Sequence, residues 1–320
     1  MSKEIEERLD KIPIVKWIVR LLKKIKLPAF EGLSLYDLVE MYITGIVQGA
    51  FSTRASSIAF SLFMALFPLL IFLFTLIPFI IPYVSVVNEN FDAQFLNFLE
   101  SFLPSATGEY FGDIYHQIKD QQSGGLLSSA FVLSIFLMTN GVSAIFGGFE
   151  DSYHINLTRN FFKQYAFAMM VGFLLSVLLI LGAVGYVYFE FYILEYLSEW
   201  AAQTRGYDLS ENDIVGARIG KTVFFIVLSY LTTAILYYFG TLEGKQAKFF
   251  SYGALMTTLL FFLTSHLFGV YINNFSRYNE LYGALGGLLI LMVYIWLNSI
   301  ILLLGFELNA TLNYLRKKHL

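Results

Sequence analysis

The feature that most constrains the fold of this chain is a series of six long apolar segments separated by polar loops. Each segment is long enough to cross the hydrocarbon core of a bilayer, about 30 Å thick, which takes about 20 helical residues. Inside lipid a backbone must satisfy its own polar groups, so the segments are predicted to be α-helices. The expected fold class is therefore all-α, a polytopic membrane protein with six transmembrane helices. The predicted spans are residues 58–83, 126–149, 165–189, 219–239, 249–272 and 283–305.

The basic residues of the loops predict the orientation of these spans. Most Lys and Arg lie before the first span, after the second, after the fourth and in the C-terminal tail. Because cytoplasmic loops are enriched in Lys and Arg, both termini are predicted to be cytoplasmic. The acidic loops at 84–125 and 190–218 then lie outside, and apolar residues at helical spacing in the first predict short helices that cap the outer mouth.

Three parts of the chain are distinguished: membrane-surface amphipathic helices in residues 1–57, a six-helix transmembrane domain in 58–315, and a basic cytoplasmic tail over 306–320. Within residues 11–27, basic side chains share one helical face and apolar side chains another. This pattern is typical of a helix on an anionic membrane surface, although a helix that docks on a partner protein shows it too. Ser34 and Asp37 have the spacing of a capping box and predict a second helix.

Polar residues in or near the spans are candidate functional residues, because charged residues make up only 14% of the chain and are costly within lipid. Each has a structural alternative: snorkelling to the interface, or hydrogen bonding to a neighbouring helix. Arg218 and Lys221 are three residues apart at the outer end of span four, so they share a face and form a candidate basic pair at the outer mouth. The candidates for a substrate pathway are Arg54, Asn140, His266 and Asn298.

The remaining candidates lie at the cytoplasmic ends of the spans and within span one. Glu150, Glu307 and Asn309 are predicted at cytoplasmic ends, where a carboxylate serves as a site or as a structural anchor. Pro68 and Pro78 interrupt the hydrogen bonding of span one, and such breaks kink a helix and can shape a cavity.

Three blocks of residues resemble the YihY/BrkB family of bacterial inner-membrane proteins. The blocks are Arg54–Phe60 followed by Phe67–Leu70, Gly141–Ile155 with Arg159 beyond, and Tyr282–Gly286 with Gly305–Ala310. Many members have Asn where this chain has Glu150. The resemblance covers about residues 34–315 and implies a six-helix protein of the bacterial inner membrane. The family's names come from serum resistance and from an old attribution to ribonuclease BN, and movement of envelope lipids or export of solutes has been proposed for members.

The residues weigh against an enzyme. Metal-assisted cleavage of RNA needs clustered carboxylates or histidines, and no spacing of metal ligands is present. No catalytic residue, metal, cofactor or nucleic-acid partner is therefore predicted. The preferred function is transport, export or flipping of an amphipathic, lipid or anionic solute, and the alternative is a non-transporting scaffold of the cell envelope. Expected partners are membrane lipids, a lipid or small-solute substrate and, as an open alternative, further copies of the chain.

Overall fold

The computed structural model describes most of the helical part of the chain. The described residues are 51–84, 97, 124–152, 155, 158–189, 211–246, 248–275 and 284–319, with residues 19, 21–26, 34–37, 39 and 40 of the N-terminal region. Regular structure in this part is helical, apart from an isolated bridge between Lys26 and Ser34. The all-α prediction is confirmed for these residues.

Six long helices account for most of the described residues, and a short 3-10 helix, η4, follows the fourth. Their bounds are α4 Phe51–Val84, α7 Gly124–Glu150, α8 Phe161–Tyr188, α10 Glu211–Gly240, η4 Glu243–Gln246, α11 Tyr252–Phe275 and α13 Ala284–His319. Each long helix covers most or all of one predicted span: α4, α7 and α10 contain theirs, whereas α8, α11 and α13 miss one to three residues at one end. The helices also extend past the apolar segments: α4 and α10 begin seven or eight residues before the predicted spans, and α13 continues through the predicted tail.

Five of the long helices, α7, α8, α10, α11 and α13, are long and apolar enough to cross a membrane within the described residues. In α4 the described apolar part is Phe51–Leu66, which is shorter. The chain is thus a membrane protein with several apolar helices, while the count of six spans stays a prediction. The predicted outer caps at 84–125 and 190–218 lie almost entirely outside the described residues.

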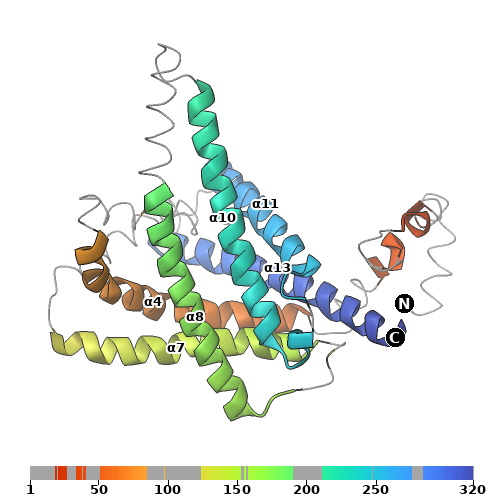
Figure 1. The fold of residues 1–320 in the computed structure, drawn as a ribbon, viewed down its shortest axis with the longest axis horizontal. Helices are drawn as coiled ribbons and strands as arrows, with labels where there is room; N and C mark the ends of the chain where they lie inside the picture. The colour runs from red at the N-terminus through yellow and green to blue at the C-terminus, as the bar shows by residue number, and fades with distance from the viewer. Residues whose placement is uncertain are drawn as a thin grey trace.

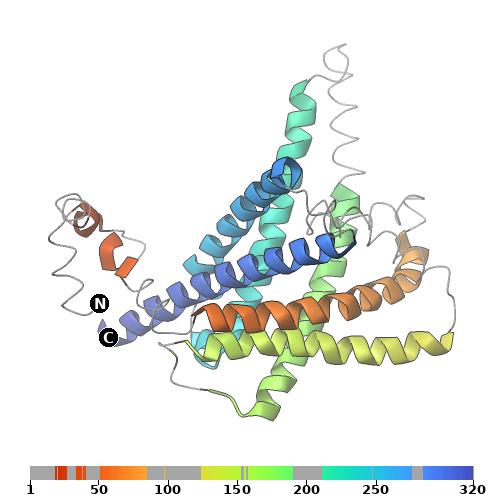
Figure 2. The same ribbon diagram turned by 180° about the vertical axis from the view of Figure 1, so that it is seen from behind.

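The long helices form a ring. Each packs against the next along the chain, and α13 packs against α4 to close the circle. The helices meet at one end and diverge from it, with α4 and α7 running to one side and α8, α10 and α11 to another (Figures 1 and 2). We call the meeting point the packed pole. It contains the starts of α4, α8 and α11, the ends of α7 and α10, and residues 299–311 of α13, so alternate loops gather at one side of the molecule.

An aromatic cluster of Phe149, Tyr237 and Phe306 fills the centre of the ring at the packed pole. Phe149 of α7 stacks on Phe306 of α13, with ring centroids 4.1 Å apart and planes 6° apart. The Tyr237 ring of α10 meets Phe149 edge-on at 5.5 Å and Phe306 at 5.8 Å. Aromatic pairs in such geometry contribute about 0.5–1.5 kcal/mol beyond the burial of their area. We call these three residues the aromatic plug, since they join helices across the ring.

Close backbone contact holds α11 against α13 beside the plug. A methyl group added at Gly253 would overlap the carbonyl oxygen of Gly305, and one added at Gly305 would lie 2.7 Å from the carbonyl oxygen of Gly253. The Tyr237 hydroxyl donates to the Leu302 carbonyl oxygen at 2.7 Å and lies 2.6 Å from Thr257 Oγ1. Small residues that let helix backbones approach, with hydrogen bonds across the contact, are characteristic of packing within membranes.

Candidate functional site

An arginine–glutamate pair joins α4, α7 and α13 at the packed pole. Arg54, in the first turn of α4, lies 3.9 Å from Glu307 of α13, measured from Nη2 to Oε2, and each side chain is 6% exposed. Arg54 Nη1 donates to the carbonyl oxygen of Gly148 at 3.1 Å. Ser152, just after α7, donates its hydroxyl to Glu307 Oε2 at 2.7 Å. We call this group the Arg54 latch.

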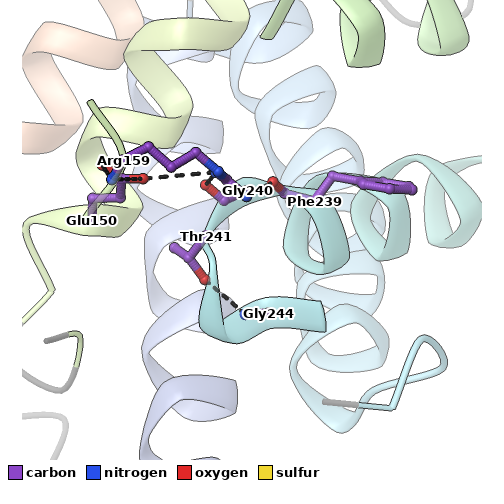
Figure 3. Close-up of polar contacts among 6 residues, drawn as sticks. All are labelled: Glu150, Arg159, Phe239, Gly240, Thr241 and Gly244. Carbon is purple, nitrogen blue, oxygen red and sulfur yellow. Dashed lines mark hydrogen bonds and ion pairs between the residues drawn. The ribbon is translucent and has the colours of Figure 1, made fainter. Parts of the chain in front are cut away.

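A second pair joins α7, α8 and α10 (Figure 3). Arg159 precedes α8 and lies 3.7 Å from Glu150, measured from Nη1 to Oε1. Its guanidinium donates to the carbonyl oxygens of Gly240 at 2.8 Å and Phe239 at 2.9 Å, at the end of α10. Burial lowers the pKa of the Arg159 guanidinium, and the Glu150 carboxylate opposes that shift. We call this group the Arg159 latch.

Both arginines bind helix ends, which explains why these positions accept buried cations. The last carbonyl groups of a helix have no partner within it, and the helix dipole places partial negative charge there. Arg54 donates to a carbonyl group in the last turn of α7, and Arg159 donates to two carbonyl groups at the end of α10. The carboxylates of the two ion pairs supply the remaining negative charge. The sequence separations are large, 94 residues for Arg54 and Gly148 and 81 for Arg159 and Gly240, so the contacts tie distant helices together.

The latches are incompletely satisfied. Among the described residues, Arg54 Nε, Arg159 Nε and Glu307 Oε1 are buried without a hydrogen-bond partner. A buried polar atom in that state costs about 1–3 kcal/mol. Replacing a buried ion pair by packed apolar side chains is often neutral or stabilising, so such a pair is weak evidence of a role in stability.

A small pocket lies beside the plug on the α10–α11 side. Its volume of about 20 Å³ is enough for a water molecule, which needs about 10–15 Å³. Tyr237 and Phe306 of the plug form part of its wall, together with Ser251, Asn309 and Lys248. The pocket therefore brings polar groups against the plug at the packed pole.

Asn309 binds the start of α11. Its Oδ1 accepts from the Gly253 amide at 2.8 Å, and its Nδ2 donates to Ser251 Oγ at 2.8 Å. Ser251 Oγ also accepts from the Ala254 amide at 3.3 Å. Asn309 thus helps to cap α11 from α13, across the glycine contact.

The other pathway candidates lie apart from this network. Asn298 is half-buried and donates to the Tyr294 carbonyl oxygen of its own helix at 2.9 Å. Asn140 of α7 is half-buried and His266 of α11 is exposed. Among the described residues, no hydrogen bond joins these three side chains to one another or to Arg54.

The outer basic pair and the two prolines are described in part. Lys221 is exposed and lies 5.2 Å above the ring centre of Tyr186, while the side chain of Arg218 is outside the described residues. Helix α4 is continuous through Pro68 and Pro78. Pro68 is buried, and the side chain of Pro78 is not among those described. Spanning helices tolerate proline where neighbouring groups or local adjustments satisfy the freed backbone.

Sequence reasoning missed Arg159, Ser152 and Tyr237 as site residues. One signal was available: Arg54 and Arg159 each precede an apolar span, whereas Glu150 and Glu307 each end one. Starts of odd-numbered spans and ends of even-numbered spans lie on the same side of a membrane, so the opposite charges could have been paired. The choice of partner depends on packing that the sequence does not display.

The residues of this site lie within the part of the chain that matches a known protein family. The sequence profile of the family described as virulence factor BrkB matches residues 43–320, which include both latches and the plug. The chain belongs to the virulence factor BrkB family. It is therefore an integral membrane protein, in agreement with its apolar helices.

Of three relatives, two match over most of their length and the third over about a third of it. A "putative ribonuclease-like protein YfkH" of Bacillus subtilis is 26% identical over 275 residues, 83% of this chain and 91% of that protein. A "UPF0761 membrane protein" of Coxiella burnetii is 26% identical over 260 residues, 79% of this chain and 84% of that protein. A "UPF0761 membrane protein" of Psychromonas ingrahamii is 39% identical over 106 residues, 32% and 35% of the two chains. No solved structure matches the chain significantly.

Proposed function

We propose that this chain is a transporter, exporter or flippase-like protein of the bacterial inner membrane, acting on an amphipathic, lipid or anionic solute. The observation that carries the proposal is the ring of helices whose centre is filled, at one pole, by aromatic side chains from three of its members. In the proposed mechanism the solute passes through the ring, and the packed pole is the closed inner gate.

The two latches support a gate at this pole. Buried ion pairs with unsatisfied atoms are a costly way to join helices in a protein with so few charges. Their partners sit on different helices, so a movement of α4 or α8 exchanges several contacts at once. A gate needs two arrangements of similar free energy, and incompletely satisfied contacts lower the cost of leaving the closed one.

The proposed orientation places the packed pole at the cytoplasm, with both termini on that side. Exposed basic side chains at this pole, Lys163 and Lys248, support it. Asn140, His266 and Asn298 remain proposed contributors of neutral hydrogen bonds along the route, with Arg218 and Lys221 at its outer end.

The experiment is a lipid-flipping assay in proteoliposomes. Phosphatidylglycerol carrying a fluorescent headgroup label is placed in both leaflets, and an impermeant reductant bleaches the outer one. The wild-type chain should speed bleaching of the inner-leaflet probe above protein-free vesicles. Arg54→Ala should change that rate because the latch is lost, and Lys163→Gln, an exposed residue outside both latches, should not.

Wild-type protein that behaves like empty vesicles towards this probe and towards a panel of anionic solutes would remove the support for transport. Folded Arg54→Ala protein that matches the wild type would remove the latch from the mechanism.

The second candidate function is a non-transporting envelope scaffold. The observation that favours it is the plug itself, since Phe149, Tyr237 and Phe306 are all buried and fill the centre of the ring at the packed pole. In that case the latches only fix the helix ends, and inactive but folded wild-type protein in the flipping assay is the expected result.

We further propose that the chain has no ribonuclease activity of its own. Glu150 and Glu307, two buried carboxylates at the packed pole, are both engaged by arginines. The described residues contain no group of three His, Asp or Glu placed to hold a metal ion. Purified chain should leave RNA intact in the presence of divalent metals, and cleavage that Glu150→Gln or Glu307→Gln abolishes would overturn this.

A further inference from the structure

The described N-terminal residues form a small hairpin. Residues 21–24 are helical, and residues 35–37 with 39 and 40 belong to a second helical arm. The arms meet through an antiparallel bridge between Lys26 and Ser34 and a hydrogen bond from the Leu35 amide to the Ile25 carbonyl oxygen at 3.0 Å. The predicted capping box is confirmed: Ser34 N donates to Asp37 Oδ2 at 2.9 Å, and Asp37 N donates to Ser34 Oγ at 3.2 Å.

The hairpin has a defined internal contact. Lys23 Nζ lies 4.5 Å above the centre of the Tyr36 ring, and Tyr36 is buried. This cation–π contact joins the two arms close to the bridge. The hairpin therefore holds its exposed side chains in a fixed arrangement, instead of presenting them on a single straight helix.

Large apolar side chains of the hairpin remain exposed. Leu21 is 44% exposed, Ile25 39% and Val39 40%. Ile25 adjoins the bridge, and Leu21 and Val39 each lie five residues from a bridge residue, on opposite arms. The bridge thus places next to each other two arms that both carry exposed apolar side chains.

Exposed lysines flank these apolar side chains. Lys23, Lys24 and Lys26 are exposed on the first arm. An apolar surface rimmed by basic residues matches the interface of an anionic membrane, where apolar side chains enter the headgroup region and lysines contact lipid phosphates. An acidic protein surface would attract the lysines, but it does not by itself provide an apolar layer for all three exposed side chains.

We propose that the hairpin formed by residues 21–26 and 34–37 with Val39 docks on the anionic leaflet next to the packed pole, with Leu21, Ile25 and Val39 in the headgroup region and Lys24 and Lys26 at lipid phosphates. The described hairpin residues lie beyond the C-terminal part of α13, on the side of the molecule where the helices meet (Figures 1 and 2). Docking there is independent of whether the bundle transports a solute.

The test uses the full chain in nanodiscs. The natural sequence has no cysteine, so Ile25→Cys provides a unique site for an environment-sensitive fluorophore. The label should be several-fold less accessible to acrylamide, an uncharged aqueous quencher, in discs that contain phosphatidylglycerol than in discs of phosphatidylcholine alone. High salt should remove most of the difference, because it screens the lysines.

Variants separate charge from structure. Replacing Lys24 and Lys26 together by Gln, with Lys23 kept for its contact with Tyr36, should abolish the effect of phosphatidylglycerol, whereas replacing both by Arg should keep it. Lys163→Gln, an exposed lysine at the start of α8, is the matched control and should leave the effect intact.

Two results would overturn the proposal: equal quenching in both lipids, or protection that survives the double Gln variant. The second would mean that the hairpin is held by something other than contacts of these lysines with anionic lipid. A loss of flipping activity with label protection unchanged would count against the proposed transport function and leave the hairpin proposal standing.

Discussion

At the scale of single residues, the sequence shows where the arginines of the packed pole lie along the chain but not which groups they bind. Arg54 was predicted to be a substrate-pathway residue or a snorkelling residue, and the structure places it in a buried contact with Glu307 and the end of α7. Arg159 was noted only for its charge and its place in a family-like block. What the sequence lacks is the partner, because the atoms that bind Arg159 belong to α10, about 80 residues later.

Arg159→Gln should destabilise the protein strongly. The substitution leaves Glu150 as an uncompensated buried charge and frees two carbonyl groups at the end of α10. Removing one partner of a buried pair costs about 3–5 kcal/mol. The measurement is chemical denaturation of detergent-solubilised protein. Lys163→Gln is the control and should stay within about 0.5 kcal/mol of the wild type; equal midpoints for both variants would contradict the role of the latch.

At the scale of elements, hydrophobic length predicted where the helices lie but not where they end. Each predicted span lies within a long helix or runs past its end by no more than three residues, because a run of about 20 apolar residues has few other stable conformations in lipid. Helix α13 nevertheless continues past residue 305, where Glu307 and Asn309 find partners on α4, Ser152 and α11. Polar residues that follow an apolar segment are easily interpreted as a solvent-exposed tail when their partners on other helices are not known.

The glycine contact between α11 and α13 makes a prediction at the same scale. Gly305→Ala should weaken their packing, because the added methyl would meet Tyr237 Oη at 2.5 Å and the Gly253 carbonyl oxygen at 2.7 Å. Overpacking of this kind costs about 1–3 kcal/mol. Gly269→Ala, in the same pair of helices with nothing within 4 Å, should instead stabilise by about 0.5–1 kcal/mol. Denaturation midpoints that shift together would argue against a tight crossing.

At the scale of the whole molecule, loop charge and helix packing group the same connections. The loops that are alternately basic and acidic in the sequence join helix ends that lie alternately at the packed pole and away from it. The loop charges predicted which connections share a side, and the packed pole gathers those helix ends. The aromatic plug was not predicted, since Phe149, Tyr237 and Phe306 are three among many aromatic residues in an apolar chain. Nothing in their local sequence marks them as neighbours.

The orientation is testable because the chain has no cysteine. Leu242→Cys, an exposed position just after α10, should react with a membrane-impermeant reagent in inside-out vesicles, which expose the cytoplasmic face, but not in intact cells. A cysteine at Gln121, in the loop predicted outside, should react in intact cells. The reverse pattern would place the packed pole outside, so that the proposed gate would close the outer end of the route instead of the inner end.

The proposed gate is tested most directly by opening it. The double variant Phe149→Ala and Phe306→Ala removes two stacked rings from the centre of the ring of helices, and Phe162→Ala removes an exposed ring at the start of α8. Each is reconstituted with labelled phosphatidylglycerol, and the rate at which the inner-leaflet probe becomes accessible is measured. A plug that closes a route predicts a faster rate for the double variant than for wild type and Phe162→Ala. Folded double-variant protein with the wild-type rate would contradict a route through the packed pole.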